Sequence, residues 1–150
     1  MICVCSHWLV SILIGTITSG LEARLHELRK GRSRVIEREH TLILGWSSKI
    51  HSIIGELVVA NTNQKRPCIV ILANRDKVEM EEQLRDKVVH QKRVKLVVRS
   101  GSSLALSDLS KVAIGASRAI VVLVDDTEQA TPDRADGRII KTLMAIFNHP

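Results

Sequence analysis

Aromatic residues are scarce in this chain of 150 residues, which has two Trp, one Phe and no Tyr. Proteins that bind single-stranded nucleic acid stack bases on several exposed rings, so this composition argues against that class. The net charge of +6 allows mild attraction to anionic partners, but the basic residues are interleaved with acidic ones. We therefore expect no nucleic-acid partner and a core of Ile, Leu and Val.

Motifs of enzymes and metal sites are also missing. The three cysteines and six histidines show no metal-binding spacing, and the Ser nucleophile elbow and the phosphate-binding loop with Lys are absent. Cys68 opens an apolar run and reads as a core residue in a reducing compartment. We expect a binding module and not an enzyme. The alternative is a soluble NAD(P)-binding oxidoreductase or another cofactor-binding protein, although an oxidoreductase would also need a substrate domain.

Formally charged residues are absent from positions 1–21, and apolar residues dominate that stretch. A span of roughly 20 mostly apolar residues can cross a bilayer, so we predict a transmembrane helix at 1–20. Basic residues follow it, which by the positive-inside rule places residues 21–150 in the cytoplasm. A secretory signal and a buried N-terminal helix are the competing interpretations.

Residues 21–39 are predicted to form an amphipathic and basic connector. Leu21, Leu25 and Leu28 share one helical face, and Gly31 is placed to end that helix. The polar stretch at 30–40 is typical of a solvated linker.

From residue 40 to residue 150, strand patterns alternate with helix patterns. Apolar runs typical of buried strands occur at 41–44, 68–73, 96–98 and 119–124, and helices are predicted at 50–58, 76–89, 103–112 and from 131 onward. This alternation predicts an α/β fold with a Rossmann-like, doubly wound parallel sheet. Such sheets usually have five or six strands, so the domain is expected to be incomplete at its C-terminal edge.

The turn after the first strand is a candidate ligand site, because backbone N–H groups and a helix N-terminus meet there. The candidates are Gly45, Ser47 and Ser48, with an ordinary capped turn as the alternative. The full dinucleotide fingerprint is absent, since Ser47 and Ile50 stand where it needs glycine.

Other candidates follow the remaining strands. Asn74 stands where a classical NAD site has an acid, Arg75 could meet a phosphate, and Ser100 could approach the same site. Asp125 and Asp126 could hold a hard cation such as Ca²⁺, or form a plain acidic turn. Classical NAD binding is therefore doubtful; the cofactor is unknown, with a nucleotide or Ca²⁺ as the candidates.

With these elements placed, the chain resembles the N-terminal lobe of RCK (TrkA-N) regulatory domains, and more narrowly the Castor/Pollux family of ion channels and their bacterial relatives. The matching stretches are 20–35, the His-Thr-Leu-Ile-Leu-Gly-Trp-Ser run at 40–47, 75–80, 99–101 and 119–124. The resemblance implies a fragment of a cation channel in which residues 1–20 end a pore-lining helix and ligand binding by the domain gates ion transport. It also implies a membrane location and homo-oligomers formed through the RCK lobes.

Overall fold

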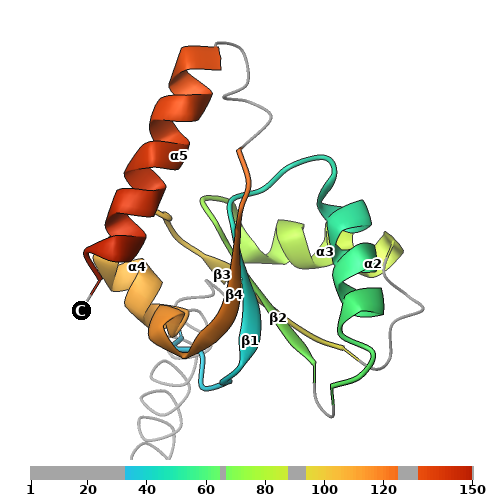
Figure 1. The fold of residues 1–150 in the computed structure, drawn as a ribbon. Helices are drawn as coiled ribbons and strands as arrows, with labels where there is room; N and C mark the ends of the chain where they lie inside the picture. Colours follow the sequence, from blue (N-terminus) through green and yellow to red (C-terminus); the bar gives the residue numbers. More distant parts are fainter. Residues whose placement is uncertain (1–32, 65–66, 88–93, 125–131, 150) are drawn as a thin grey trace, which may run out of the picture.

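A computed structural model of the chain describes residues 33–64, 67–87, 94–124 and 132–149 (Figure 1). The described part contains β1 His40–Leu44, α2 Ile50–Ala60, β2 Cys68–Ala73, α3 Lys77–Lys87, β3 Lys95–Ser100, α4 Leu106–Lys111, the 3-10 turn η1 Ile114–Ala116, β4 Ser117–Val122 and α5 Pro132–Phe147. None of the helices in these ranges is long and apolar enough to cross a bilayer. The predicted membrane helix at 1–20 and most of the connector lie outside the described residues.

The strands form one parallel sheet in the order β3-β2-β1-β4. This confirms the predicted Rossmann-like α/β fold. The order reverses between β1 and β4, and doubly wound sheets bind their ligands beside such a point, at the carboxyl ends of the strands. β1 and β2 are buried along their whole length, as the apolar runs at 42–44 and 68–73 predict, and the polar His40 and Thr41 that begin β1 are buried too.

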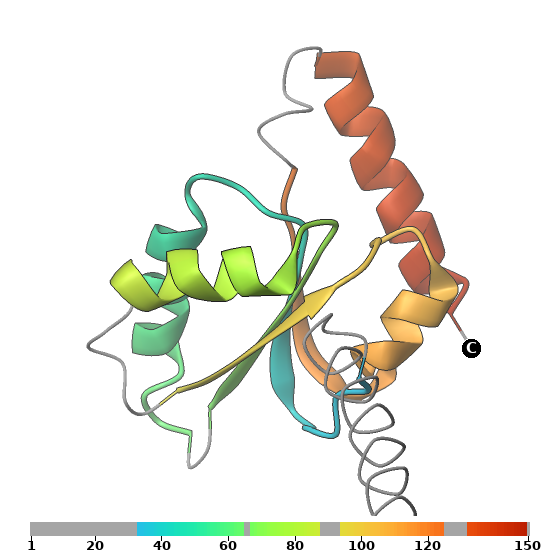
Figure 2. The same ribbon diagram turned by 180° about the vertical axis from the view of Figure 1, so that it is seen from behind.

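Each face of the sheet is covered by its own pair of helices (Figures 1 and 2). Ile43, Ile69 and Ile71 point to the face covered by α2 and α3, where Ile50, Ile54 and Met80 pack. The intervening residues of the strands point to the other face, where the buried residues are Val35, Leu42, Leu44, Cys68, Val70, Leu72, Val97, Leu109, Val112 and Ile114. This alternation places two cores on one sheet.

Three predicted boundaries are corrected. β3 covers Lys95–Ser100 and not only 96–98, while β4 covers Ser117–Val122 and not 119–124. β4 begins early because η1 leads directly into it and Ser117 already pairs with His40. The helix predicted at 103–112 begins at Leu106, with Ala105 at its N-cap and no side-chain cap. The Ser102 hydroxyl instead accepts a hydrogen bond from the Leu104 N–H, which forms a turn before the helix.

Helix α5 is only partly buried. Ala145 and Ile146 pack against the core, and Thr142 is buried. Much of its predicted apolar face is exposed, namely Ile140, Leu143, Met144 and Phe147. One short sheet has little room to cover this apolar surface.

Residues 33–39, which we call the strap, lie against the domain. Val35 is buried in the core, and its N–H donates to the Lys111 carbonyl at 2.7 Å. Arg99 Nε donates to the Ser33 carbonyl at 2.7 Å, and Glu37 forms an ion pair with Lys95. The prediction of a solvated linker is therefore wrong for the inward positions Val35 and Glu37, whereas the exposed positions are Arg34, Ile36, Arg38 and Glu39. A single Val among charged residues has no periodicity that could have revealed this contact.

Candidate functional site

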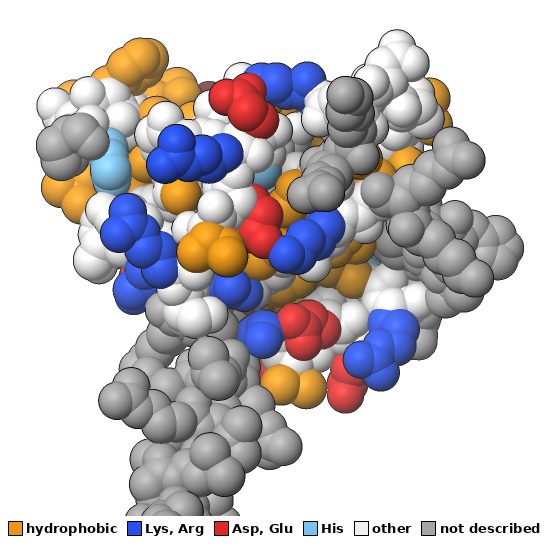
Figure 3. Space-filling view, turned by 90° about the horizontal axis from the view of Figure 1, so that it is seen from below, with side chains coloured by type: hydrophobic (Ala, Val, Ile, Leu, Met, Phe, Trp, Pro, Cys, Tyr) orange, Lys and Arg blue, Asp and Glu red, His pale blue; other side chains and the backbone are white. Residues whose placement is uncertain are grey.

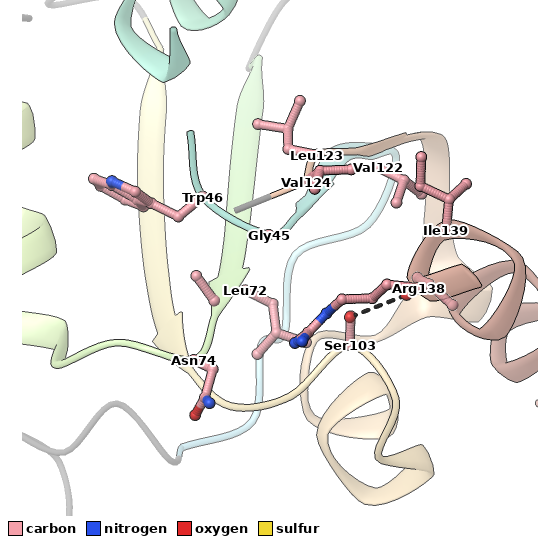
Figure 4. A pocket seen from close by; sticks show the side chains of 12 residues that line it. Gly45, Trp46, Leu72, Asn74, Ser103, Val122, Leu123, Val124, Arg138 and Ile139 are labelled. Atoms are coloured by element: carbon pink, nitrogen blue, oxygen red, sulfur yellow. Dashed lines mark hydrogen bonds between the residues drawn. The ribbon is translucent and has the colours of Figure 1, made fainter. Parts of the chain in front are cut away.

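A small pocket lies at the carboxyl edge of the sheet, between the strand ends and α5 (Figure 4). Its volume is about 30 Å³, which is room for a few waters. The lining residues come from the ends of β1, β2 and β4, from the loop after β3, and from α5: Gly45, Trp46, Leu72, Ala73, Asn74, Ser103, Val122, Leu123, Val124, Arg138, Ile139 and Thr142.

Gly45 is required by the close approach of β1 to the end of β4. Its φ is +101°, and a Cβ there would lie 2.2 Å from the Leu123 carbonyl oxygen. The Gly45 N–H donates to the Leu72 carbonyl at 2.8 Å, and the Leu123 N–H donates to the Leu44 carbonyl at 2.7 Å. In this arrangement the Gly45 N–H is bound within the sheet and does not point at a ligand.

Ser47 and Ser48 lie in the turn before α2 and do not line the pocket. Ser47 is buried; its hydroxyl accepts from the Lys49 N–H at 3.3 Å, and its carbonyl accepts from the Ile50 N–H at 3.0 Å. Ser48 is exposed. The geometry of Ser47 is that of a turn held by its own side chain.

The residues after β2 and β3 are joined to each other. Asn74 is exposed and lines the pocket, whereas Arg75 lies over the buried Trp46 ring at 6.0 Å. The Ser100 hydroxyl donates to the Arg75 carbonyl at 2.7 Å. Of the six predicted ligand residues, Gly45 and Asn74 therefore line the pocket, and Ser100 positions the turn that carries Asn74.

Sequence reasoning missed the part of the pocket that α5 supplies. Arg138 contributes the only charged side chain among the described lining residues, and Figure 4 shows it extending from α5 toward Ser103. The hydroxyls of Ser103 and Thr142 are hydrogen-bonded at 3.2 Å. Arg138 and Thr142 are four residues apart and so share a helix face, and a Thr within an apolar face was the available signal.

The loop that carries Ser103 is fixed by Asp108. Its carboxylate accepts from the Ser102 N–H at 2.9 Å and from Lys111 Nζ at 2.6 Å. A Cβ on Gly101 would lie 2.8 Å from the same carboxylate and 3.0 Å from Leu72. Gly101 thus lets Asp108 lie across the loop and hold one wall of the pocket.

The candidate cation ligands Asp125 and Asp126 lie outside the described residues. Within the described ranges, His, Cys, Asp and Glu form no group of three that could hold a metal ion. What the described arrangement offers is a polar recess with one guanidinium, two hydroxyls and an amide, which are groups suited to binding.

Comparisons with known proteins agree with the fold. The family described as the calcium-activated potassium channel slowpoke-like RCK domain matches residues 36–150. Over 136 residues, or 91% of the chain, the sequence is 38% identical to the probable ion channel CASTOR of Oryza sativa subsp. japonica and 35% identical to the ion channel CASTOR of Lotus japonicus. It is also 38% identical over 136 residues to the ion channel DMI1 of Medicago truncatula.

The chain spans 15% of the length of the Oryza and Medicago relatives and 16% of the Lotus relative. Among the described residues, the match contains the whole sheet, the pocket and most of the strap. The chain belongs to the Slo-like RCK domain family, with similarity to the CASTOR and POLLUX ion channels.

Proposed function

We propose that this chain is a regulatory domain of a Castor/Pollux-like cation channel, which couples ligand binding to ion transport and does not catalyse a reaction. The observation that carries this proposal is a polar pocket at the switch point of an RCK sheet, with one wall on α5 and the others on the strands. A ligand there would favour one packing of α5 against the sheet. Coupling requires such a difference in affinity between two arrangements.

Hydrogen bonds and an ion pair connect the pocket to the strap. Ser103 lies in the loop held by Asp108, and Asp108 is paired with Lys111. The Lys111 carbonyl accepts the N–H of Val35, which begins the buried part of the strap. A movement of this loop would therefore also move the strap, which leads toward the predicted pore-lining helix at 1–20. The connector at 21–39 would carry the motion, with residues 21–150 in the cytoplasm.

The ligand proposed for this edge is a nucleotide or Ca²⁺. Gly45, Asn74, Arg75 and Ser100 surround the recess or support its walls, with Ser47 and Ser48 at the neighbouring turn. Asp125 and Asp126 follow the lining residue Val124 in sequence and are proposed cation ligands. Classical NAD binding has less support, because the Gly45 N–H is engaged and Ile50 is fully buried where the fingerprint has glycine.

Assembly is the other part of the proposal. The exposed apolar residues of α5 favour contact with a second RCK lobe, which would form homo-oligomers beneath a membrane pore. Ring assembly would let ligand binding in several lobes act on one pore.

A chimeric channel tests the regulatory role. Residues 36–150 would replace the matching segment of the Oryza relative, and cation flux from vesicles would be measured with ATP, NAD or Ca²⁺ present. We expect the cation flux to depend on one of these ligands. Arg138→Gln should weaken that dependence, whereas Lys141→Gln, a change at an exposed position of the same helix, should leave it unchanged. A folded chimera that conducts equally with and without every ligand to which the parent channel responds would contradict the proposal.

A further inference from the structure

The strap presents two different faces, because its backbone alternates. The inward positions are fixed to the domain: Val35 is buried in the core, and the carboxylate of Glu37 meets Lys95. The pairing with Lys95 lowers the pKa of Glu37, so the carboxylate stays ionised and its negative charge is balanced by Lys95 on the domain side. Two backbone hydrogen bonds, from Val35 to Lys111 and from Glu39 to Ala116, hold the segment at 2.7 Å and 2.8 Å.

The outward positions are Arg34, Ile36 and Arg38. All three are exposed, and Ile36 is 85% exposed, as much as any large apolar side chain in the described part. Among the described residues, neither arginine has a hydrogen bond or an ion pair. The result is an apolar side chain between two available guanidinium groups, on a backbone that is held in place.

This combination fits an anionic lipid surface. One guanidinium group can donate two parallel hydrogen bonds to the oxygens of one phosphate. An exposed apolar side chain between two such groups is stabilised when it enters the boundary between headgroups and acyl chains. Figure 3 looks at the end of the molecule where β1 begins, and Lys and Arg side chains lie there beside exposed hydrophobic ones, with Asp and Glu side chains among them. Glu39 is the exposed acid of the strap, and it stands at the bend before β1.

We propose that the outward face of the strap binds anionic phospholipid headgroups, with Arg34 and Arg38 on the phosphates and Ile36 inserted between them. This inference rests on the proposed membrane location and adds a lipid-binding surface to it. The bound lipid would hold the strap, and through Val35 and Lys111 it would hold the end of α4. The occupancy of that surface would then influence the same elements that form the pocket wall.

A fluorescence experiment on the full chain tests this. Cys3 and Cys5 are replaced by Ser, and the buried Cys68 stays unlabelled. The variant Ile36→Cys is then labelled with bimane, an apolar fluorescent ring that takes the place of the isoleucine side chain. The chain is mixed with vesicles of phosphatidylcholine, with or without phosphatidylglycerol, that carry a headgroup quencher. We expect quenching that grows with the anionic lipid. Arg34→Glu with Arg38→Glu should remove most of this dependence on anionic lipid.

Matched controls separate the causes. Lys49→Glu with Lys141→Glu changes the net charge equally on exposed positions elsewhere and should leave the quenching unchanged. A label at Val59→Cys, a position 67% exposed on α2, should show no dependence on anionic lipid. If the chain did not bind to either kind of vesicle, the result would contradict the membrane location and this inference together. Recovery with the vesicles but no quenching at position 36, as expected if the face met an acidic protein, would overturn the lipid inference alone.

Discussion

The two faces of the sheet differ in how completely this chain covers them. On one face, α2 and α3 bury Ile50, Ile54, Met80 and Leu84 against the strands. On the other face, α4 is short, α5 is only partly buried, and the pocket and the strap lie there. The first face is organised as a stable core. The second combines a core with surfaces available to a ligand, a lipid or another protein lobe, and this is where we place the regulation.

Gly45 lies where the two faces meet, and its replacement should have the largest effect. Gly45→Ala places a Cβ 2.2 Å from the Leu123 carbonyl oxygen at a φ of +101°. We expect a loss of about 4 kcal/mol or more in the free energy of unfolding, measured by urea denaturation. Gly55→Ala is the control, because a Cβ there meets nothing within 4 Å inside α2, and it should stabilise by about 0.5–1 kcal/mol. Equal effects of the two changes would contradict the proposed close approach.

Truncating one isoleucine on each face sharpens the comparison. Ile54 is fully buried on the α2 side, so Ile54→Ala should cost about 2–5 kcal/mol in unfolding free energy. Ile140 on α5 is 58% exposed, so Ile140→Ala should change the free energy of unfolding by no more than about 0.5 kcal/mol. Thermal and urea unfolding of both variants at low protein concentration would check this. A large cost at Ile140 would show that α5 is packed like α2.

Acid should destabilise the side that carries α4. His40 is fully buried, its Nε2–H donates to the Val112 carbonyl at 3.1 Å, and its Nδ1 has no hydrogen-bond partner among the residues that the structure describes. Burial lowers the pKa of His40, so the folded state favours the neutral ring and the unfolded state binds the extra proton. Stability should therefore fall as pH drops below about 6.5, by at most about 1.4 kcal/mol per pH unit. His40→Gln should reduce this dependence of stability on pH. An unchanged dependence would mean that other titratable groups cause it.

The smallest expected effect on stability belongs to the outer side of α5. Leu143→Asp should leave the unfolding free energy within about 0.5 kcal/mol, because Leu143 is 40% exposed. It should shift the protein toward monomer, since the exposed apolar face of α5 is the proposed contact between lobes. Light scattering over a concentration series measures this. A monomeric parent whose melting temperature alone responds to the change would mean that Leu143 is part of the core.

The sequence predicted the fold better than the site. Apolar runs identified β1 and β2, and the helix predicted at 76–89 does begin beside Asp76, whose carboxylate accepts from the Val78 N–H at 2.8 Å. Helix periodicity also identified the buried side of α2. These signals are local, because a periodicity or a cap involves residues near one another in the chain.

The pocket wall and the strap depend on contacts between distant residues. Ser103 meets Thr142 across 39 positions, and Arg99 meets Ser33 across 66. No local pattern reports such pairs, so Arg138 and Thr142 were not proposed as site residues. Gly45 was proposed for a phosphate, whereas its backbone position is explained by the carbonyl of Leu123.

The docked strap also determines how the domain would bear a mechanical load. A pull on the segment before Ser33 would not act on β1 alone. It would be shared by the bond to Arg99 in β3, by the bond from Val35 to the end of α4, and by the Glu37–Lys95 ion pair. These contacts precede β1 in the chain, so they must yield before tension reaches the strand. The domain is therefore expected to transmit a small displacement at its N-terminal side as a movement of α4 and β3, without first unfolding its central strand.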